Sequence, residues 1–466
     1  MKVEGENMLN KDVRNVENRV EMFIDTWLID KMDGVSLKLH KPEKREVVLM
    51  FDRIWEGNLS CYVSVFKDGD NIRMYYRGSS PSDISRDQVT CYAESCNGID
   101  FTKPSLGLYE FEGSKENNIV LKGKDSHNFA PFKDQNPNCN ALQEQRYKAI
   151  GGLPPEGLTA YCSGDGIHWS KMQEEPIITK GELDSHNIAF WDTEKKIYRC
   201  YSRYFQQVEA EDVESDVEGF VRAIQSFSSE NFIDWSDPVP NIYRENVPWE
   251  HFYTNSTVQC PGAPHIYLSF PKRFLPKRKK VKEHPLNGVS DAVFMSSRDG
   301  IHWERTFLEA WVRPGLDIRN WTDRNNMVAW GIVQTSPDEF SMYISEHYRM
   351  QDARLRRMTI RRHGFGSVNA GWKEGNFVTH PLIFKGKQLI LNYSTSAAGY
   401  IKVELRDENN QTIPGYGFED MDELYGDELD HIVCWKNNAD IIAFSGRPVR
   451  FAFKMKDADI FALCAR

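Results

Sequence analysis

"SGDGIHWS" (Ser163–Ser170) returns almost unchanged as "SRDGIHWE" (Ser297–Glu304). Weaker relatives of this segment are "SCNGIDFT" (Ser95–Thr102), "SSENFIDWS" (Ser228–Ser236) and "RRHGFGS" (Arg361–Ser367). Aligned on the turn residues at positions 98, 166, 232, 300 and 364, the five copies are spaced by 68, 66, 68 and 64 residues. Such regular spacing indicates that one structural unit is repeated along the chain.

The sequence before each copy follows one pattern. An apolar strand, a polar turn and a second strand rich in Tyr and Phe come first, as in "CYVSVFKDGDNIRMYYRG" (Cys61–Gly78) and "NIAFWDTEKKIYRCYSR" (Asn187–Arg203). A third strand leads into the Asp-Gly turn, and a fourth, poorer strand follows. Four short antiparallel strands, repeated five times, predict an all-β fold with a five-bladed β-propeller.

The repeated motif itself is expected to be structural. Its Asp and Gly are typical of a tight turn between the third and fourth strands, and its Trp is expected to fill the space between blades. His168 and His302 are therefore not expected to bind a ligand.

The pattern changes after Phe365, where about eight short alternating strands follow without a further Asp-Gly-Ile-His-Trp turn. This is typical of a β-sandwich, for which we expect a structural or dimer-forming role. We therefore predict three parts: an N-terminal segment, residues 1–45, that packs on the propeller or the sandwich; a catalytic five-bladed β-propeller, residues 46–367; and a C-terminal β-sandwich, residues 368–466. The oligomeric state stays open.

Composition narrows the function classes. A formal net charge of −10 argues against nucleic acid as the main partner. No apolar run is long enough to span a membrane, and the polar N-terminus has no signal-peptide core. The nine cysteines form no CxxC pair, so we expect free thiols in a reducing cytoplasm, with no structural zinc and no cofactor. The 12 Trp, 19 Tyr and 26 Phe suit β-structure and also carbohydrate sites.

Propeller geometry predicts where the polar residues meet. Because successive strands are antiparallel, the start of each first strand and the end of each second strand lie on one face, around one mouth of the central channel. The polar residues at the strand starts are Asp52, Glu56, Asn58, Asp125, His127, Asn128, Asp184, His186, Asn187, Glu250, His251, Asn255, Asp317, Arg319, Asp323 and Arg324. Those at the ends of second strands are Arg77, Arg203, Lys272, Arg273, Glu346 and His347.

A ring of carboxylates, imidazoles and guanidiniums suits glycoside cleavage. That reaction needs one protonated carboxyl group to donate to the leaving group and one ionised carboxylate to act as base or nucleophile. Like charges raise some pKa values and nearby cations lower others, which separates the acid from the base.

The architecture and the S-x-D-G-I-H-W turns resemble the family 32 and family 43 glycoside hydrolases and their relatives, over nearly the whole chain. The family 32 signatures W-x-N-D-P-N-G, R-D-P and E-C are absent, and "FDRIWEGN" and "DSHN" stand in the places of the first two. The resemblance implies an Asp of the first blade as nucleophile or base, an orienting Asp in the second or third blade, and a Glu farther along as the acid.

On this basis we predict specific roles. Asp184 is the leading catalytic carboxylate, Glu250 beside Trp249 is the leading general acid, Asp52 or Glu56 is the base or nucleophile, and Glu346 is the reserve acid. The residues predicted to bind sugar hydroxyls or a substrate anion are His127, Asn128, His186, Asn187, His251, Asn255, Arg77, Arg203, Asp323, Arg324 and His347. No metal ligand is predicted.

The tetrapeptide Asp-Ser-His-Asn occurs twice, at Asp125–Asn128 and Asp184–Asn187, and marks the entry of an inner strand in two successive units. An Asn recurs near this point in all five units, so part of its role is expected to be structural. Asp125 is interpreted as a turn residue, in contrast to Asp184.

Two other functions remain open. A glycoside phosphorylase of the family 130 kind would use phosphate as the nucleophile and need only one protein acid, and a non-catalytic propeller would only bind carbohydrate. The charged insertions Gln206–Gly219 and Pro271–Gly288 are either solvated loops or segments that pair with each other, form a lid or meet a subunit. The basic run of the second insertion could instead attract an anionic sugar. The sugar, the linkage and the stereochemical outcome are not set by the sequence.

Overall fold

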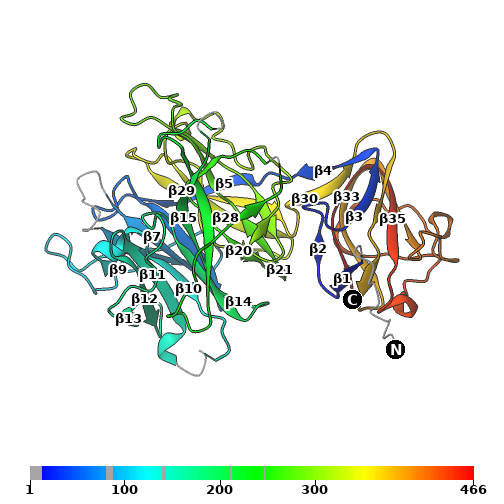
Figure 1. The fold of residues 1–466 in the computed structure, drawn as a ribbon, viewed down its shortest axis with the longest axis horizontal. Helices are drawn as coiled ribbons and strands as arrows, with labels where there is room; N and C mark the ends of the chain where they lie inside the picture. The colour runs from blue at the N-terminus through cyan, green and yellow to red at the C-terminus, as the bar shows by residue number, and fades with distance from the viewer. Residues whose placement is uncertain (1–12, 80–87, 139–142, 210–212, 246) are drawn as a thin grey trace, which may run out of the picture. The chain divides into compact units, whose positions relative to one another are not determined.

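The computed structural model describes residues 13–79, 88–138, 143–209, 213–245 and 247–466. These residues form an all-β protein whose only helices are short 3-10 turns (Figure 1). Two compact units are present: unit 2 is Pro42–Ile360, and unit 1 combines the described residues up to Lys41 with Arg361–Arg466. The predicted division at residues 45 and 367 stays a prediction.

Unit 2 begins with three consecutive four-stranded antiparallel sheets, one for each of the first three repeats. The first sheet contains β6 (Cys61–Asp68), β7 (Asn71–Gly78), β8 (Val89–Ser95) and β9 (Ile119–Lys122). The second contains β10 (Ala130–Lys133), β11 (Tyr147–Leu153), β12 (Gly157–Ser163) and β13 (Ser170–Lys171). The third contains β14 (Ile188–Asp192), β15 (Ile197–Gln207), β16 (Phe220–Ser229) and β17 (Val239–Pro240). The sequence order of the strands is also their order in each sheet.

The fourth repeat is divided into two three-stranded sheets and a short parallel pair. One sheet contains β20 (Val258–Cys260), β21 (Ala263–Ser269) and β24 (Met295–Ser297). The other contains β19 (His251–Phe252), β22 (Lys272–Leu275) and β23 (Val289–Ala292). The pair is β18 (Ile242–Tyr243) with β25 (His302–Trp303). The split carries β22 and β23 away from the first sheet of this repeat and toward the second insertion.

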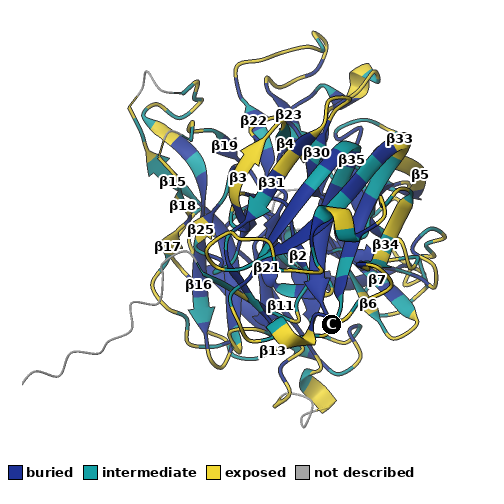
Figure 2. Cartoon of the chain, turned by 90° about the vertical axis from the view of Figure 1, so that its right-hand side faces the viewer, coloured by how far each residue is buried: buried dark blue, intermediate teal, exposed yellow. Residues whose placement is uncertain are grey.

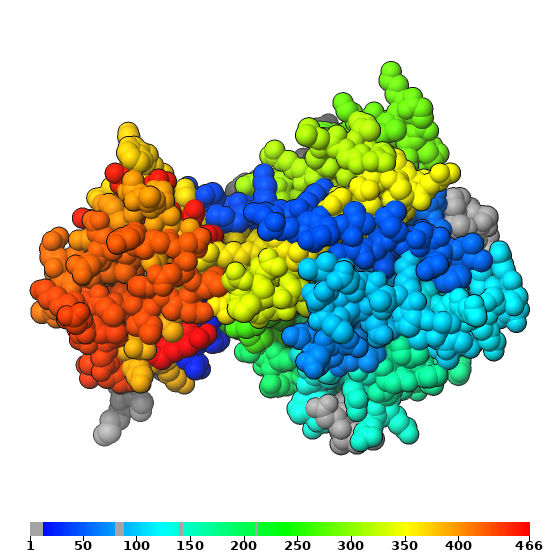
Figure 3. Space-filling model, turned by 180° about the vertical axis from the view of Figure 1, so that it is seen from behind, coloured from blue at the N-terminus to red at the C-terminus, as the bar shows by residue number. Residues whose placement is uncertain are grey.

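The last sheet of unit 2 takes its outer strand from the N-terminal side of the chain. Its strands are β26 (Met327–Val328), β27 (Val333–Gln334), β28 (Glu339–Glu346), β29 (Arg354–Arg361) and β5 (Glu43–Met50). Strand β5 pairs antiparallel with β29, and Figure 3 shows this N-terminal segment in blue along the yellow residues of β29. The first and last repeats also meet, because the Trp330 amide donates to the Val63 carbonyl at 2.8 Å.

The repeated turns do what the sequence predicts. Asp165 Oδ1 accepts the backbone N–H groups of Ile167 and His168, each at 2.8 Å, and Asp299 makes the equivalent bonds. Gly166 and Gly300 have φ of 77° and 78°, a left-handed conformation that glycine adopts without strain. The structural interpretation of the motif is confirmed.

Tyrosines of second strands tie these turns to neighbouring sheets. Tyr75, Tyr201 and Tyr343 donate to the carbonyls of Gly166, Gly300 and Gly98 at 2.8, 2.9 and 2.8 Å. Trp303, with 1% of its surface exposed, belongs to a core cluster built from several successive sheets. Figure 2 shows many strands largely in dark blue and many loops in yellow, although β3 (Ile29–Asp33) and β5 carry exposed residues.

Unit 1 is built around two long strands, β33 (Leu389–Arg406) and β35 (Arg450–Ala465), which pair antiparallel over most of their length. The other strands are β1 (Arg14–Glu17), β2 (Glu21–Met22), β3 (Ile29–Asp33), β4 (Val35–Leu39), β30 (Gly366–Ala370), β31 (Gly375–Thr379), β32 (Leu382–Phe384) and β34 (Asp427–Ile432). Its 3-10 turns are η5 (Phe418–Asp420) and η6 (Ile442–Phe444), and those of unit 2 are η1 (Lys124–His127), η3 (Gln143–Gln145) and η4 (Ile318–Asn320). The five-blade count and the β-sandwich stay predictions.

Among the described residues, no helix is long and apolar enough to cross a membrane. Eight cysteines are free thiols, while Cys139 lies outside the described residues.

Candidate functional site

Asp184 stands at the entry to β14 with its side chain 45% exposed, and it forms an ion pair with Arg203 of β15. Arg203 is 6% exposed. The backbone carbonyl of Asp184 accepts from His127 Nε2 at 2.9 Å, and Tyr62 Oη lies 3.4 Å from the same oxygen. Residues from three repeats therefore hold the segment that presents this carboxylate to solvent.

Four cations surround one aromatic ring beside Asp184. The ring is that of Tyr253, which is 7% exposed. The charged groups that lie over it, with their distances to the ring centroid, are Arg203 at 4.9 Å, Arg222 at 5.5 Å, Lys272 at 3.9 Å and Arg324 at 5.2 Å. Cation–π attraction holds each cation to the ring, but it does not neutralise the charge. We call these five residues the Tyr253 cluster.

Lys272 is the unusual member of the Tyr253 cluster. It has no exposed surface, and its Nζ has no hydrogen-bond partner among the described residues. Burial holds its pKa well below the usual value, and the nearby charge of Arg324 adds to this effect. A buried amine without a partner is costly. An anion that bound here would remove that cost by supplying both a counter-charge and an acceptor.

Arg77 also lacks a carboxylate partner among the described residues. Its guanidinium donates to the Leu59 carbonyl and contacts Cys61 Sγ, both at 2.9 Å, and lies 4.6 Å from the Tyr62 ring centroid. Arg77 therefore carries a positive charge that has no carboxylate partner, and Lys272 is a buried amine without a hydrogen-bond partner among the described residues.

Three members of the Tyr253 cluster, Tyr253, Arg222 and Arg324, line a cavity of about 390 Å³, which we call the mouth cavity. Asp216 and Asp323 line it together with Tyr253, Arg222, Phe274 and Arg324. Asp216 makes a bidentate pair with Arg222 at 2.6 and 2.9 Å, and this pair outweighs burial to lower the pKa of Asp216. Asp323 is 3% exposed and lies 2.8 Å from His284 Nε2.

The two charged insertions form the wall of the mouth cavity. Ser215 and Asp216 of the first insertion face it, and so do Pro276 and Lys277 of the second. The insertions also touch, because the Lys277 amide donates to Glu214 Oε1 at 2.9 Å. Of the alternatives for these insertions, this contact supports the one in which they pair with each other.

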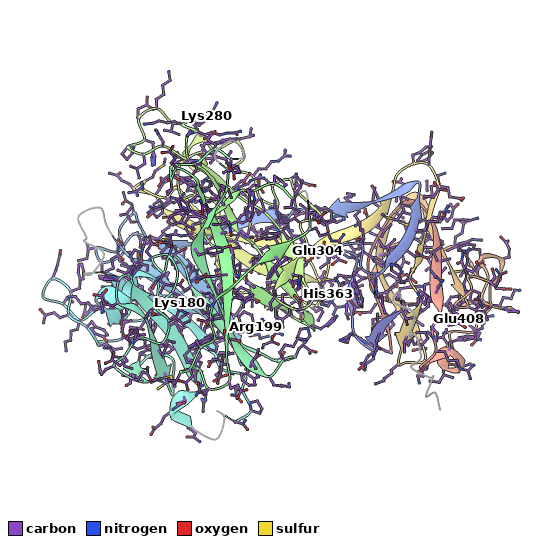
Figure 4. The ribbon with its side chains drawn as sticks, viewed as in Figure 1. Lys180, Arg199, Lys280, Glu304, His363 and Glu408 are labelled. Carbon is purple, nitrogen blue, oxygen red and sulfur yellow. The ribbon has the colours of Figure 1, made fainter. Side chains whose placement is uncertain are left out.

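The second insertion packs against β22 at its C-terminal end, and its middle projects outward. An added Cβ at Gly288 would come within 2.3 Å of the Phe274 ring, so the end of this insertion packs directly on β22. Figure 4 shows Lys280 of the same loop projecting outward at the top of the view, and it is exposed.

The predicted histidines beneath the mouth are neutral. Burial lowers the pKa of His127 and of His186 to about 3, and in both cases the positive charge of Arg77 adds to the shift. The His186 ring stacks on Tyr62 with centroids 5.5 Å apart. These imidazoles can accept or donate hydrogen bonds, but they supply no charge at neutral pH.

The predicted asparagines bond to the backbone. Asn128 and Asn187 both donate from Nδ2 to the carbonyls of Leu183 and Ser185, at 2.6 to 3.0 Å. Asn255 Nδ2 lies 3.3 Å from the Tyr201 carbonyl. These contacts support the structural part of the asparagine prediction, and the substrate-binding part stays a prediction.

Several predicted acids lie outside the Tyr253 cluster. Glu250 pairs with Arg273 at 2.7 Å and with Arg305 at 2.6 Å, next to a separate cavity. Asp52 is 61% exposed on its side chain and lies 3.1 Å from Lys103. Their catalytic roles stay predictions, since neither contacts a member of the cluster in the described part of the chain.

Glu56 and Glu346 are enclosed by their own partners. Glu56 has no exposed surface and accepts from Tyr76 Oη at 2.6 Å and from Lys103 Nζ at 2.8 Å. Burial acts to raise the pKa of Glu346, but Lys44 and Arg356 outweigh it and keep that pKa low. The low pKa makes Glu346 a poor proton donor, and the contacts of both residues favour structural roles.

The remaining predicted histidines also have partners. His347 lies between Asp317 and Asp352, each at 2.8 Å. His251 Nδ1 accepts from the Arg222 amide at 3.2 Å, behind the Tyr253 cluster. Among the described residues, no group of three or more His, Cys, Asp or Glu side chains is arranged to hold a metal ion.

Sequence reasoning misses three members of the Tyr253 cluster as site residues: Tyr253, Arg222 and Lys272. The sequence places Lys272 at the mouth as the end of a second strand, but it lies in the run "PKRFLPKRKK", where nothing distinguishes it from exposed lysines. Arg222 is a third-strand residue that the distortion of the fourth repeat brings beside Tyr253. The sequence signal that could have indicated Tyr253 is an aromatic residue directly before the polar residues at a strand start, as in "HFYTN".

No family model matches the chain, and no curated protein matches it. Solved structures that it resembles include several described as glycoside hydrolases. A Bacillus subtilis family 43 arabinoxylan arabinofuranohydrolase in complex with cellotetraose is 9% identical, with a TM-score of 0.42 over 90% of this chain and 98% of that one. An N-acetylgalactosamine deacetylase from F. plautii is 12% identical, with a TM-score of 0.46 over 70% and 95% of the two chains. The catalytic domain of a Coprinopsis cinerea GH62 α-L-arabinofuranosidase is 10% identical, with a TM-score of 0.40 over 69% and 97%.

Proposed function

We propose that the chain is an enzyme that cleaves glycosidic bonds and that inorganic phosphate attacks the sugar. The proposal includes the predicted architecture, in which five β-propeller blades surround the channel and a β-sandwich follows. The single observation that carries it is the buried, unpartnered Nζ of Lys272 among three arginines over one tyrosine ring.

Charge explains why the bound group is an oxyanion. Asp184, Asp216 and Asp323 each have a cationic partner, whereas Lys272 and Arg77 have no carboxylate partner among the described residues. Phosphate carries up to two negative charges near neutral pH and several acceptor oxygens, and arginine donates to it in a fork geometry. Such an anion supplies what the Tyr253 cluster lacks.

Asp184 is the carboxyl group best placed to exchange a proton with the sugar, because it is half exposed and adjoins the cluster. Arg203 contacts both Asp184 and the Tyr253 ring, so phosphate over that ring competes with Asp184 for the guanidinium. Once released from Arg203, Asp184 can carry the proton that the leaving oxygen needs.

The proposed reaction is a direct displacement. A phosphate oxygen forms the bond to the anomeric carbon while the bond from that carbon to the leaving oxygen breaks, and the leaving oxygen takes the proton from Asp184. The products are a sugar phosphate and the shortened glycan.

Hydrolysis of a glycan that itself carries a carboxylate or sulfate is the second candidate. The ion pair between Asp184 and Arg203 favours it, because an ion-paired carboxylate is the form that activates water. In this reaction the Tyr253 cluster would hold the anionic group of the sugar.

The test is turnover of a panel of neutral and anionic oligosaccharides, with and without inorganic phosphate, followed by chromatography and phosphorus NMR. Phosphorolysis predicts a sugar phosphate and no reaction without phosphate. Equal rates without phosphate on an anionic glycan would establish hydrolysis instead. Asp184→Asn is expected to slow either reaction by about 10²- to 10⁴-fold, and an unchanged rate would overturn the role of Asp184.

Binding provides a second readout. Phosphate should raise the unfolding temperature of the wild-type protein and should do so much less for Lys272→Gln or Arg324→Gln. Lys280→Gln is the matched control, since it makes the same charge change on the same insertion at an exposed position. An equal phosphate response in all four proteins would contradict the proposal.

A further inference from the structure

The two faces of strand β22 (Lys272–Leu275) border different cavities. Because successive side chains of a strand point to opposite faces, Lys272 and Phe274 share one face and Arg273 and Leu275 share the other. Lys272 and Phe274 belong to the mouth side, and Arg273 and Leu275 line two further cavities. The strand is therefore a wall between the proposed phosphate site and a second region.

The second region adjoins the mouth cavity at Phe274. Phe274 lines both the mouth cavity and a neighbouring cavity of about 390 Å³. That cavity shares Arg273, Leu275, Arg278 and Asp291 with a third one of about 610 Å³. We call the second and third cavities together the β22 groove. Its size falls in the range that holds small ligands, so the groove has room for sugar units beyond the one at the mouth.

The charges of the β22 groove are balanced, unlike those of the mouth. Arg273 makes a bidentate pair with Asp291 at 2.9 and 2.7 Å and also contacts Glu250 at 2.7 Å. Burial raises the pKa of Asp291, and the neighbouring charge of Glu250 adds to the shift while Arg273 opposes it. Further charged side chains of both signs also line the groove, namely Arg278, Arg313, Glu214 and Glu309. Such a lining suits neutral hydroxyl groups rather than a second anion.

Apolar surface is also exposed in the β22 groove. Trp249 is 38% exposed in the second cavity, and Leu308 is 44% exposed in the third. An indole ring offers a flat apolar face of the kind on which a sugar ring packs, while the charged pairs beside it serve the hydroxyl groups. Each of the two cavities of the groove therefore combines an exposed apolar side chain with polar groups.

We infer that the β22 groove binds the neutral sugar units that follow the cleaved bond, so that the substrate is an oligosaccharide of three or more units. The inference rests on the proposed function for the position of the cleaved bond. It is separable from that function, because the groove is lined by residues that have no part in binding phosphate.

The probes are neutral β-linked gluco-, xylo- and manno-oligosaccharides of one to six units, and binding is measured by tryptophan fluorescence and calorimetry. We expect affinity in at least one series to rise about tenfold between two and four units. Trp249→Ala should remove that rise without changing the response to phosphate. Leu308→Arg, which fills the third cavity, should limit the gain to the shorter chains.

Trp372→Ala is the matched control, since it removes a 68% exposed indole from the other unit. The same loss of binding in Trp372→Ala, or affinity that does not depend on chain length in any series, would overturn the inference. Failure of the proposed function gives a different result. In that case Lys272→Gln and phosphate have no effect, while Trp249→Ala still weakens binding of the longer oligosaccharides.

Discussion

The two Asp-Ser-His-Asn segments have the same sequence and precede equivalent strands, β10 and β14, but their acids differ in environment. Asp125 is 6% exposed and accepts a hydrogen bond from Tyr161 Oη at 2.6 Å. Asp184 is half exposed and pairs with Arg203. The partner comes from β12 in one case and from β15 in the other. The sequence of a motif thus sets its place in the fold, and the neighbouring strands set its chemistry.

The first copy also supports the second. Its Asn128 donates to the carbonyls of Leu183 and Ser185, on either side of Asp184, and its His127 contacts the Asp184 carbonyl. The second copy makes no equivalent set of contacts to the backbone of the first in the described part of the chain. We therefore call Asp125–Asn128 the supporting segment and Asp184–Asn187 the presenting segment, because the first holds the backbone of the second and the second exposes its carboxylate.

The largest expected difference between the copies is in turnover. Asp184→Asn should lower kcat by about 10²- to 10⁴-fold, because a positioned acid or base contributes about that much to a reaction. Asp125→Asn is the matched change in the first copy and should leave kcat near the wild-type value. Initial rates on a glycan substrate measure both. Equal losses in the two variants would show that the copies do not differ in function.

Acid stability should depend on the histidines of both copies, because burial lowers the pKa of His127 and of His186 to about 3. The folded protein keeps His186 neutral down to a pKa of about 3, whereas the unfolded chain takes up a proton near 6.5. Since the unfolded state binds more protons, stability is full above about pH 6.5 and falls as the pH is lowered toward 3. The contribution of His186 at pH 5 is a loss of about 2 kcal/mol.

His186→Phe keeps a ring against Tyr62 and removes the titration. The free energy of unfolding should therefore fall by about 2 kcal/mol less between pH 7 and pH 5 than in the wild-type protein, as measured by urea denaturation. His168→Phe, at an exposed turn, is the control and should not change this difference. An unchanged difference in His186→Phe would show that His186 is not held neutral.

Much of the β-structure could be predicted from the regular spacing of the Asp-Gly turns, because a local turn and its flanking strands are encoded within about seventy residues. The pairing of β5 with β29 could not, because it joins residues about 310 positions apart, as in the contact between Glu46 and Arg357. The sequence predicted that Asp184 and Asp125 have different roles, but not which residues contact them. Their partners, Arg203 and Tyr161, are not adjacent to them in the chain.

The candidate site was predicted less completely for a related reason. Asp184 and Arg324 could be predicted at the mouth because they precede first strands, and Arg203 because it lies toward the end of a second strand. Lys272 lies inside a basic run, and burial, not residue type, distinguishes it from Lys280. The contacts of the four basic side chains with the Tyr253 ring depend on the division of the fourth repeat into two sheets. No local sequence pattern predicts that division.

The two copies should also differ in how far the free energy of unfolding falls when their acid is replaced. Asp125→Ala leaves Tyr161 Oη, in a residue that is 6% exposed, without its partner, and this should lower the free energy of unfolding by about 1 to 3 kcal/mol. Asp184→Asn should change it by less than about 1 kcal/mol, because Asp184 is half exposed. Chemical denaturation measures both. A larger cost for Asp184→Asn would reverse the assignment of supporting and presenting segments.

The smallest expected effect tests whether the two copies act together. Asn128 and Asn187 donate to the same two carbonyls, so each carbonyl keeps one donor when a single asparagine becomes alanine. The double variant leaves both carbonyls without a side-chain donor. Its loss of stability should therefore exceed the sum of the single losses by about 0.5 to 1 kcal/mol in a double-mutant cycle. Additive losses would mean that each asparagine stabilises only its own segment, and the first copy would then not support the second.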